Sequence, residues 1–300
     1  MKIRIEILGI IVVLALAAVI PTIVFLARSP VLVVTDHSFI PLYGTARIKG
    51  ELARSSFSLF RRVKIVLIAD DSGDDIVRFV IEETSKRPHS VIFPLRFAGA
   101  ARFYRENHPR IPVIILEGRY PETENPSFSA IESNNADDYF IYKTDINTDF
   151  YRAGLASAIL DRDKNDRIAV FLETNLQIQA REAFSQALND LEKPLQASYF
   201  TQFSMFSGNS GFSCVVISGI GAEYFEKYSN VPIIFFSWID PALVPVDVVL
   251  ILDDSPLAQA VEAVRMASAG VTKGTVKSKP VFLPGSGIEK EILRKIKRIR

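Results

Sequence analysis

The sequence predicts an α/β protein in which two doubly wound parallel-sheet lobes follow an N-terminal transmembrane helix. A chain of 300 residues is long enough to bury two cores of about 120 residues each. Short continuous apolar runs, such as residues 63–69 and 231–236, are typical of strands buried on both faces of a parallel sheet. These runs alternate with amphipathic segments of helical length, which favours parallel strands joined by crossover helices.

The N-terminus begins with Lys2 and Arg4, after which residues 7–27 are apolar. About 21 apolar residues are enough for one bilayer-spanning helix, whereas the apolar region of a cleaved signal peptide is usually shorter. We therefore expect an uncleaved signal anchor over residues 1–29, rather than a cleaved signal peptide or a buried globular helix. The basic residues ahead of the span predict a single-pass inner-membrane protein whose soluble part lies on the periplasmic or extracellular side.

The first half of the soluble chain alternates strand and helix. The expected strands are 31–35, 63–69, 91–95 and 112–116, and the expected helices are 43–59, 74–86 and a third that ends near residue 107. Residues 120–138 are rich in Pro, Asn, Glu and Ser, which predicts an irregular connection.

A second strand-helix series begins in mid-chain. A strand over 139–143 leads to Asp145 and a helix, then to a strand over 168–172 and a helix with Asn175 at its N-cap. The remaining elements are expected to be strands 197–200, 213–218, 231–237, 248–252 and 280–283, with a helix over 256–269. The basic amphipathic segment 289–300 is interpreted as a helix packed on the second lobe, with contact to anionic lipid as the alternative.

Several residues of the mid-chain unit carry a resemblance: Asp145, Gly154, the strand 168–172, Arg181, Phe184, Ala187 and Leu188. Their order and spacing resemble the type 1 periplasmic binding proteins and the related effector domains of lac-repressor-like regulators. The resemblance implies two Rossmann-like lobes joined by a multi-strand hinge. By this resemblance, lobe one comprises residues 30–145 plus about 252–275, and lobe two comprises 146–251 plus about 276–300.

Ligands of open α/β sheets bind beyond the carboxyl ends of the strands, so polar and aromatic residues at those positions are the candidate ligand-binding residues. They are Asp36, His37, Phe39, Asp70, Phe97, Asp145, Asn175, Trp238 and Asp253. Each has a structural alternative. An Asp after a strand often caps the next helix, Asp145 could brace the hinge, His37 could lie on the surface, and Trp238 could fill the edge of a lobe.

The sequence also argues against several classes. A net charge of +1 implies no strongly basic face, so nucleic acid is not an expected partner. The run Asp145, Asn147, Asp149 begins like a calcium loop but lacks its Gly and Glu, and the histidines are scattered, so neither a metal nor a cofactor is expected. Cys214, the single cysteine, is expected to be a buried structural thiol.

No catalytic signature is present, so the chain is not expected to be an enzyme. A hydrolase that uses Asp70 and Glu117 is the alternative from another class. The leading hypothesis is a membrane-anchored extracytoplasmic solute-binding protein that holds a small polar ligand, sugar-like or nucleoside-like, between its lobes. By resemblance its partner would be an ABC-type permease. A receptor module for a membrane signalling partner and a structural envelope protein are two further hypotheses. The apolar N-terminus disfavours a cytoplasmic transcription regulator.

Overall fold

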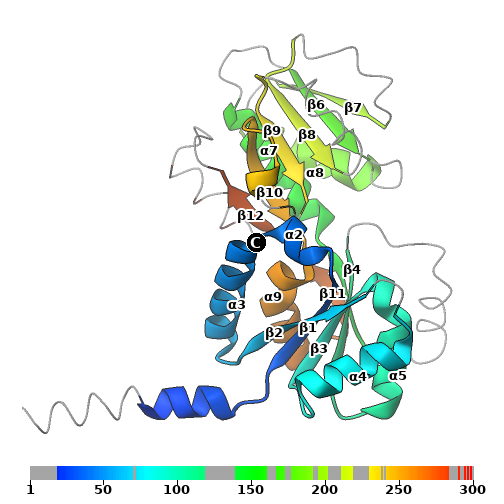
Figure 1. Cartoon of the computed structure of the whole chain (residues 1–300). Coiled ribbons are helices and arrows are strands. Elements are labelled where there is room, and N and C mark those ends of the chain that lie inside the picture. Colours follow the sequence, from blue (N-terminus) through cyan, green and yellow to red (C-terminus); the bar gives the residue numbers. More distant parts are fainter. Residues whose placement is uncertain are drawn as a thin grey trace, which may run out of the picture.

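The fold was determined from a computed structural model of the whole chain (Figure 1). The structure describes residues 19–69, 72–118, 139–160, 167–172, 177–191, 195–201, 211–218, 230–237, 239, 241–283, 290, 294, 296 and 298.

Two six-stranded sheets build the molecule, one in each lobe (Figure 1). The sheet of lobe one has the order β11-β5-β4-β3-β1-β2, and every pairing in it is parallel. Its strands are β1 (Val31–Asp36), β2 (Val63–Ile68), β3 (Ser90–Pro94), β4 (Val113–Gly118), β5 (Phe140–Thr144) and β11 (Lys273–Val276). The first five follow the 2-1-3-4-5 order of one common doubly wound fold.

Helices cover both faces of the lobe-one sheet because its strands are apolar on both faces. Helices α4 and α5 lie on one side of the sheet and α3 and α9 on the other (Figure 1). Leu32 and Val34 share a buried cluster with residues of α4 and α5, while Val31 and Val33 share one with residues of α2, α3 and α9. The helices are α2 (Phe39–Tyr43), α3 (Thr45–Leu59), α4 (Asp74–Thr84), α5 (Ala98–Asn107) and α9 (Pro256–Ser268), and a 3-10 turn, η1 (Leu95–Phe97), precedes α5.

Lobe two repeats the same strand order with one change at the edge. Its sheet is β12-β10-β9-β8-β6-β7, in which β12 alone runs antiparallel to its neighbour β10. The strands are β6 (Arg167–Leu172), β7 (Gln196–Phe200), β8 (Cys214–Ser218), β9 (Ile233–Phe236), β10 (Val248–Asp253) and β12 (Lys279–Phe282), with helices α7 (Ile146–Leu160) and α8 (Gln177–Asp190) and a 3-10 turn, η6 (Pro241–Leu243). The predicted pair of doubly wound lobes is confirmed, whereas their residue boundaries stay a prediction.

The resemblance residues have a packing role. Helices α7 and α8 lie in contact, and a Cβ added at Gly154 would come within 2.7 Å of the Ala187 Cβ and 2.8 Å of the Phe184 carbonyl oxygen. Phe184, Ala187 and Leu188 are buried, and Arg181 is exposed. Gly154 therefore permits the close approach of the two helices.

Some details differ from the sequence prediction. The helix expected over 43–59 begins at Thr45, and a separate short helix, α2, ends at Tyr43, since Gly44 adopts a positive φ of 83° between α2 and α3. Strand β11 was not predicted, because its four residues KGTV lack an apolar run. Cys214 is buried, as expected. Ile296 of the C-terminal segment is buried in the apolar cluster of lobe two, which favours packing on that lobe.

A helix over residues 19–27 is the described portion of the predicted span 7–27, and residues 7–18 lie outside the described part of the chain. Within the part that the structure describes, no helix combines the length and the apolar composition needed to cross a bilayer.

Candidate functional site

The two lobes are joined at three neighbouring crossings of the chain. They lie between β5 and α7, between β10 and α9, and between β11 and β12. The Asp145 N–H donates to the Val276 carbonyl at 2.9 Å, which ties the first crossing to the third. The Gln259 amide donates to the Thr144 hydroxyl at 3.1 Å and to the Val276 carbonyl at 3.3 Å. These bonds tie α9, the helix that follows the second crossing, to the first and third crossings. The three crossings therefore form one hinge.

Asp145 is a bracing residue within this hinge. Its carboxylate accepts hydrogen bonds from the Thr148 N–H at 3.0 Å and from the Thr148 hydroxyl at 2.7 Å, which caps the first turn of α7. Asn147 and Asp149 lie in the same turn of helix rather than in a loop. This geometry supports the bracing alternative for Asp145, while a ligand contact by this residue stays a prediction.

A buried ion pair on α7 is hydrogen-bonded to the third crossing. Asp149 and Arg152 of α7 are buried with 3.7 Å between their charged groups. Arg152 donates to the Ser278 carbonyl at 2.8 Å, and Asp149 accepts from the Ser278 N–H at 3.3 Å and from its hydroxyl. Burial lowers the pKa of Arg152, and the Asp149 carboxylate opposes that shift. Both charges are thus compensated locally, as buried charges require.

Asp253 ends β10 at the second crossing and is fully buried. Its carboxylate accepts from the Tyr43 hydroxyl at 2.7 Å, from Arg47 at 2.6 Å and from the Ser255 N–H at 2.9 Å. Burial raises the pKa of Asp253, and the Arg47 charge opposes the rise. Burial and the Asp253 charge likewise raise the pKa of the Tyr43 hydroxyl well above its ordinary value.

Helix α3 links the lobes directly. Besides Asp253, the guanidinium of Arg47 donates to the Ile239 carbonyl of lobe two at 2.7 Å. One turn further along α3, Glu51 forms an ion pair with Lys279 of β12. Two successive turns of a lobe-one helix are therefore bonded to lobe two.

The strand-order reversal of lobe one lies between β1 and β3, and a charge pair spans it. Asp36 at the end of β1 is buried and pairs with Arg96, which follows β3. The same carboxylate accepts from the Phe39 N–H at 2.9 Å and from the Ser38 hydroxyl. The Arg96 side chain remains 41% exposed and stacks over Phe97. Arg96 can therefore offer donors to a ligand while Asp36 holds it in place.

A second charged pair lies further along the same edge. Glu117 near the end of β4 is buried, and its carboxylate is 3.3 Å from the ammonium of Lys143 on β5. The carboxyl edge of lobe one therefore carries both signs of charge, on Arg96 and Lys143 and on Asp36 and Glu117. Within the described residues, no three His, Cys, Asp or Glu side chains lie close enough to hold a metal ion.

The predicted site residues separate into three groups. Asp145 and Asp253 lie at the lobe junction, Asp36 lies at the carboxyl edge of the lobe-one sheet, and all three are bonded as described above. His37 is exposed in the turn after β1, Phe39 is buried and stacked on Tyr43, and Phe97 is buried under Arg96. Asp70, Asn175 and Trp238 lie outside the described residues. Ligand contact by all nine stays a prediction.

Sequence reasoning missed Tyr43, Arg47 and Lys143. Tyr43 and Arg47 are four residues apart, on either side of the Gly44 break between α2 and α3, and the Arg47 guanidinium lies 4.2 Å from the Tyr43 ring centroid. That spacing was the available signal, but their shared partner Asp253 lies 206 residues beyond Arg47. Lys143 carried no signal, because a lysine in a strand usually lies on a solvated edge.

Comparisons with family models and with curated proteins give no match. Solved structures do match. A transcriptional activator of the comK gene from Bacillus halodurans has 12% identity and a TM-score of 0.55, with 90% of this chain and 95% of that chain covered. An ABC transporter solute-binding protein from Conexibacter woesei has 10% identity and a TM-score of 0.55, with 90% and 94% covered. The chain has the fold of the type 1 periplasmic binding proteins and the lac-repressor-like regulators.

Proposed function

We propose that this chain is a membrane-anchored extracytoplasmic solute-binding protein that captures a small polar, sugar-like ligand between its two lobes. The observation that carries the proposal is the Asp36–Arg96 pair at the strand-order reversal of lobe one. Ligands of doubly wound folds bind outside the carboxyl ends of the strands at this point.

The charged groups of this edge suit a polyhydroxyl ligand. Arg96 and Lys143 supply donors, and the carboxylates of Asp36 and Glu117 hold those donors in place. The Phe97 ring is buried and lies 5.1 Å from the Arg96 guanidinium, which helps to hold Arg96 in position. Charge of both signs favours a neutral polar ligand over a strongly charged one.

The hinge provides the response to binding. A ligand that contacts both lobes stabilises the closed arrangement by its differential affinity for that arrangement. The three crossings are short and mutually bonded, so closure would proceed by rotation about them. In this proposal, an ABC-type permease recognises the closed form and residues 1–29 hold the protein at the inner membrane. The solute-binding protein from Conexibacter woesei supports transport as the setting.

The test is a thermal-shift titration of the full chain in detergent against monosaccharides, nucleosides and amino acids. A ligand at a hundredfold excess over its Kd stabilises the folded state by about 2.7 kcal/mol, which a melting curve resolves. We expect a shift with one or more sugars, and an Arg96→Met variant should bind that sugar about 10- to 100-fold more weakly, since it loses charged hydrogen bonds.

Arg102→Met is the matched control, because Arg102 also pairs with a carboxylate, Glu106 at 3.0 Å, but on the outer surface of α5. Its sugar affinity should equal that of the unchanged chain. The absence of any shift across the panel, or equal affinity in the Arg96 variant, would contradict the proposal. Conversion of the sugar to a product, lost in Glu117→Gln, would favour the hydrolase alternative.

Uptake separates the transport and receptor roles. If the chain serves a permease, uptake of the identified sugar by cells should fall when the gene is deleted. Unchanged uptake together with intact sugar binding would favour a receptor module for a membrane signalling partner.

A further inference from the structure

Basic residues lie together at the amino-terminal ends of the lobe-one strands, opposite the carboxyl ends where the candidate ligand site lies. We call this surface the base and define it by Arg28, Arg61, Arg62, Lys86, Arg87 and Arg110. They occupy the segments that immediately precede β1, β2, β3 and β4, so parallel pairing brings them to one edge. The net charge of +1 conceals this segregation.

These cations have few counter-charges. Within the part of the chain that the structure describes, none of the six forms an ion pair with a carboxylate. The neighbouring carboxylate of Glu82 is occupied by Arg78 at 3.6 Å and by His108 at 2.9 Å, and Glu83 is exposed beside it. The Arg61 guanidinium donates to a neutral group, the Ser29 carbonyl, at 3.4 Å. The base is therefore a positively charged surface.

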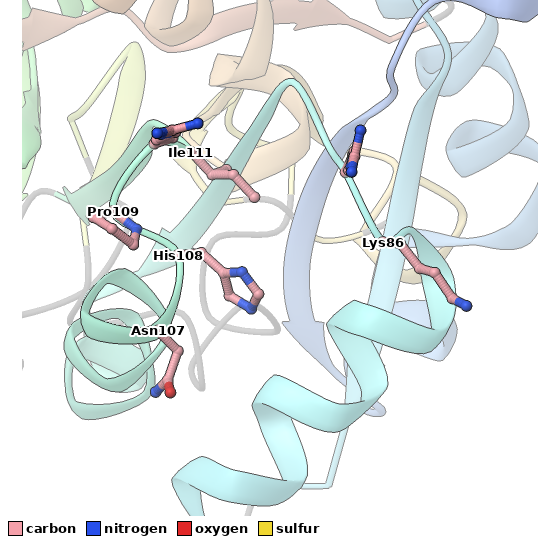
Figure 2. Close-up of a pocket in the computed structure, with 7 residues that line it drawn as sticks. Lys86, Asn107, His108, Pro109 and Ile111 are labelled. Carbon is pink, nitrogen blue, oxygen red and sulfur yellow. The ribbon is translucent and has the colours of Figure 1, made fainter.

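The base is also hollowed. A depression of about 560 Å³ lies between the C-terminal ends of α4 and α5 and is lined by Lys86, Arg87, Asn107, His108, Pro109, Arg110 and Ile111. Figure 2 shows His108 within it and Lys86 at the end of α4. Lys86, Arg87 and Arg110 are exposed around it. Such a depression could admit an anionic headgroup between the basic side chains.

Apolar rings adjoin the charges. Phe57 is 85% exposed at the last turn of α3, and Phe60 is 38% exposed just after it. The helix over residues 19–27 contacts Phe60: the Phe25 ring centroid is 5.8 Å from the Phe60 ring centroid, and Arg28, just after the helix, stacks on Phe60. Exposed aromatic and basic side chains together are typical of a surface that meets a membrane interface.

Helix ends offer a simpler explanation of part of this charge. The base receives the C-terminal ends of α3, α4 and α5, and basic residues there complement the helix dipoles. The interaction with the helix dipole falls off within the last turn of the helix. Arg110 lies beyond the end of α5, and Arg61 and Arg62 are two consecutive arginines beyond the end of α3. A dipole interaction is also indifferent to lipid, which separates the two explanations by experiment.

The chain connectivity places the base close to any bilayer that residues 7–27 enter. Three residues, 28–30, separate the helix over 19–27 from β1. Three extended residues span at most about 11 Å, which is close to the Debye length of about 8 Å at physiological ionic strength. A negatively charged leaflet at that distance would attract the base.

We propose that the base docks on anionic phospholipid headgroups and so fixes the orientation of the two lobes above the membrane. The proposal rests on the proposed membrane anchor. Docking would leave the opposite edge of the sheet, with Asp36 and Arg96, facing away from the bilayer.

The experiment uses the full chain in lipid nanodiscs with a spin-labelled headgroup. A fluorophore is attached at Ser58→Cys, an exposed position in the last turn of α3, or at Ser185→Cys on α8 of lobe two. Replacing phosphatidylcholine with a mixture that contains phosphatidylglycerol should raise quenching at position 58 and not at position 185. Raising the salt from about 0.1 M to about 1 M shortens the Debye length from about 10 Å to about 3 Å and should remove the effect.

The variant Lys86→Gln, Arg87→Gln, Arg110→Gln should lower the ratio of docked to undocked protein by about fivefold for each charge, on the order of 100-fold in total. The control Lys49→Gln, Arg167→Gln, Arg181→Gln removes three exposed charges elsewhere and should dock as the unchanged chain does. Equal melting temperatures of the two variants would show that lost helix-end interactions are not the cause.

Quenching that does not depend on phosphatidylglycerol, in a chain that stays in the disc and binds its sugar, would overturn the docking proposal alone. Equal docking of the two triple variants would overturn the assignment to the base. Failure of the chain to remain in either kind of disc would overturn the anchor and the docking with it, while sugar binding would be judged by its own melting curve.

Discussion

The two lobes share a strand order but use their equivalent helix pairs differently. In each lobe, the helix that has just crossed the hinge lies beside the long helix that connects the first two strands of the sheet. These pairs are α9 with α3 in lobe one and α7 with α8 in lobe two. The lobe-two pair is joined by close backbone approach at Gly154, whereas α3 sends Arg47 and Glu51 across to the other lobe.

The difference shows how one topology can serve two purposes. Close packing through a small residue makes α7 and α8 a rigid unit, because interdigitated helices have little room for adjustment. Polar contacts from α3 to lobe two are directional and can be exchanged for other hydrogen bonds as the lobes move. We therefore expect α7 and α8 to govern the stability of lobe two, and α3 to govern both stability and the equilibrium between lobe arrangements.

Arg47 should give the largest effect. Arg47→Met removes the charge that faces the fully buried Asp253, and loss of one partner of a buried pair reduces stability by about 3 kcal/mol. Arg54→Met on the same helix is the control. The Arg54 side chain is 61% exposed in its pair with Glu51, so its loss should change stability by at most about 0.5 kcal/mol. Urea unfolding at neutral pH measures both.

The Arg47 variant should also respond to pH. Without the opposing Arg47 charge, the folded-state pKa of Asp253 rises further above its unfolded value. The folded state then binds more protons than the unfolded state between those two pKa values, so the stability of the variant increases as the pH falls. A deficit that stays constant from pH 7 to about pH 5 would contradict this account of Asp253.

Gly154→Ala should have an intermediate effect. The new Cβ would lie 2.8 Å from the Phe184 carbonyl oxygen, so the helices must separate, with a loss of about 1–3 kcal/mol. Gly50→Ala in α3 is the matched control, because nothing lies within 4 Å of its added Cβ. Alanine there should stabilise the protein by about 0.5–1 kcal/mol through its better helix propensity. A neutral Gly154→Ala variant would show that α7 and α8 can adjust after all.

His89 should give the smallest effect. It immediately precedes β3, at the same end of the lobe-one strands as the base. Burial lowers its pKa, and the charge of Arg61 lowers it further. The unfolded state therefore binds the proton more readily, so stability should decrease as the pH falls below about 6.5. His89→Gln should flatten this dependence, and Arg61→Gln should give an intermediate slope. Thermal melts from pH 7.5 to about pH 5 measure both.

Apolar periodicity was sufficient to predict most of the fold. Continuous runs such as those of β1 and β10 are buried on both faces, and their positions along the chain follow from hydrophobicity alone. Strand β11 was missed because it is an edge strand with one buried residue, Val276, so pairing with β5 rather than composition defines it.

The site was predictable only as a set of strand ends. Asp36 and Asp253 could be placed at the carboxyl edges because parallel strands end together. Their partners could not, since Arg96 reaches Asp36 from another strand and Arg47 reaches Asp253 from a helix 206 residues earlier. The positively charged surface called the base was missed for the same reason, because its residues are brought together only by strand pairing.

The interleaved order of the edge strands has a consequence for synthesis and folding. Strand β11 completes the sheet of lobe one but follows all five parallel strands of lobe two, and β12 completes lobe two only after β11. The sheet of lobe one cannot be completed until β11 has been synthesised, and the sheet of lobe two cannot be completed until β12 has been synthesised. Pairings so distant in sequence slow folding, so a nascent chain would keep both edges open for most of its translation.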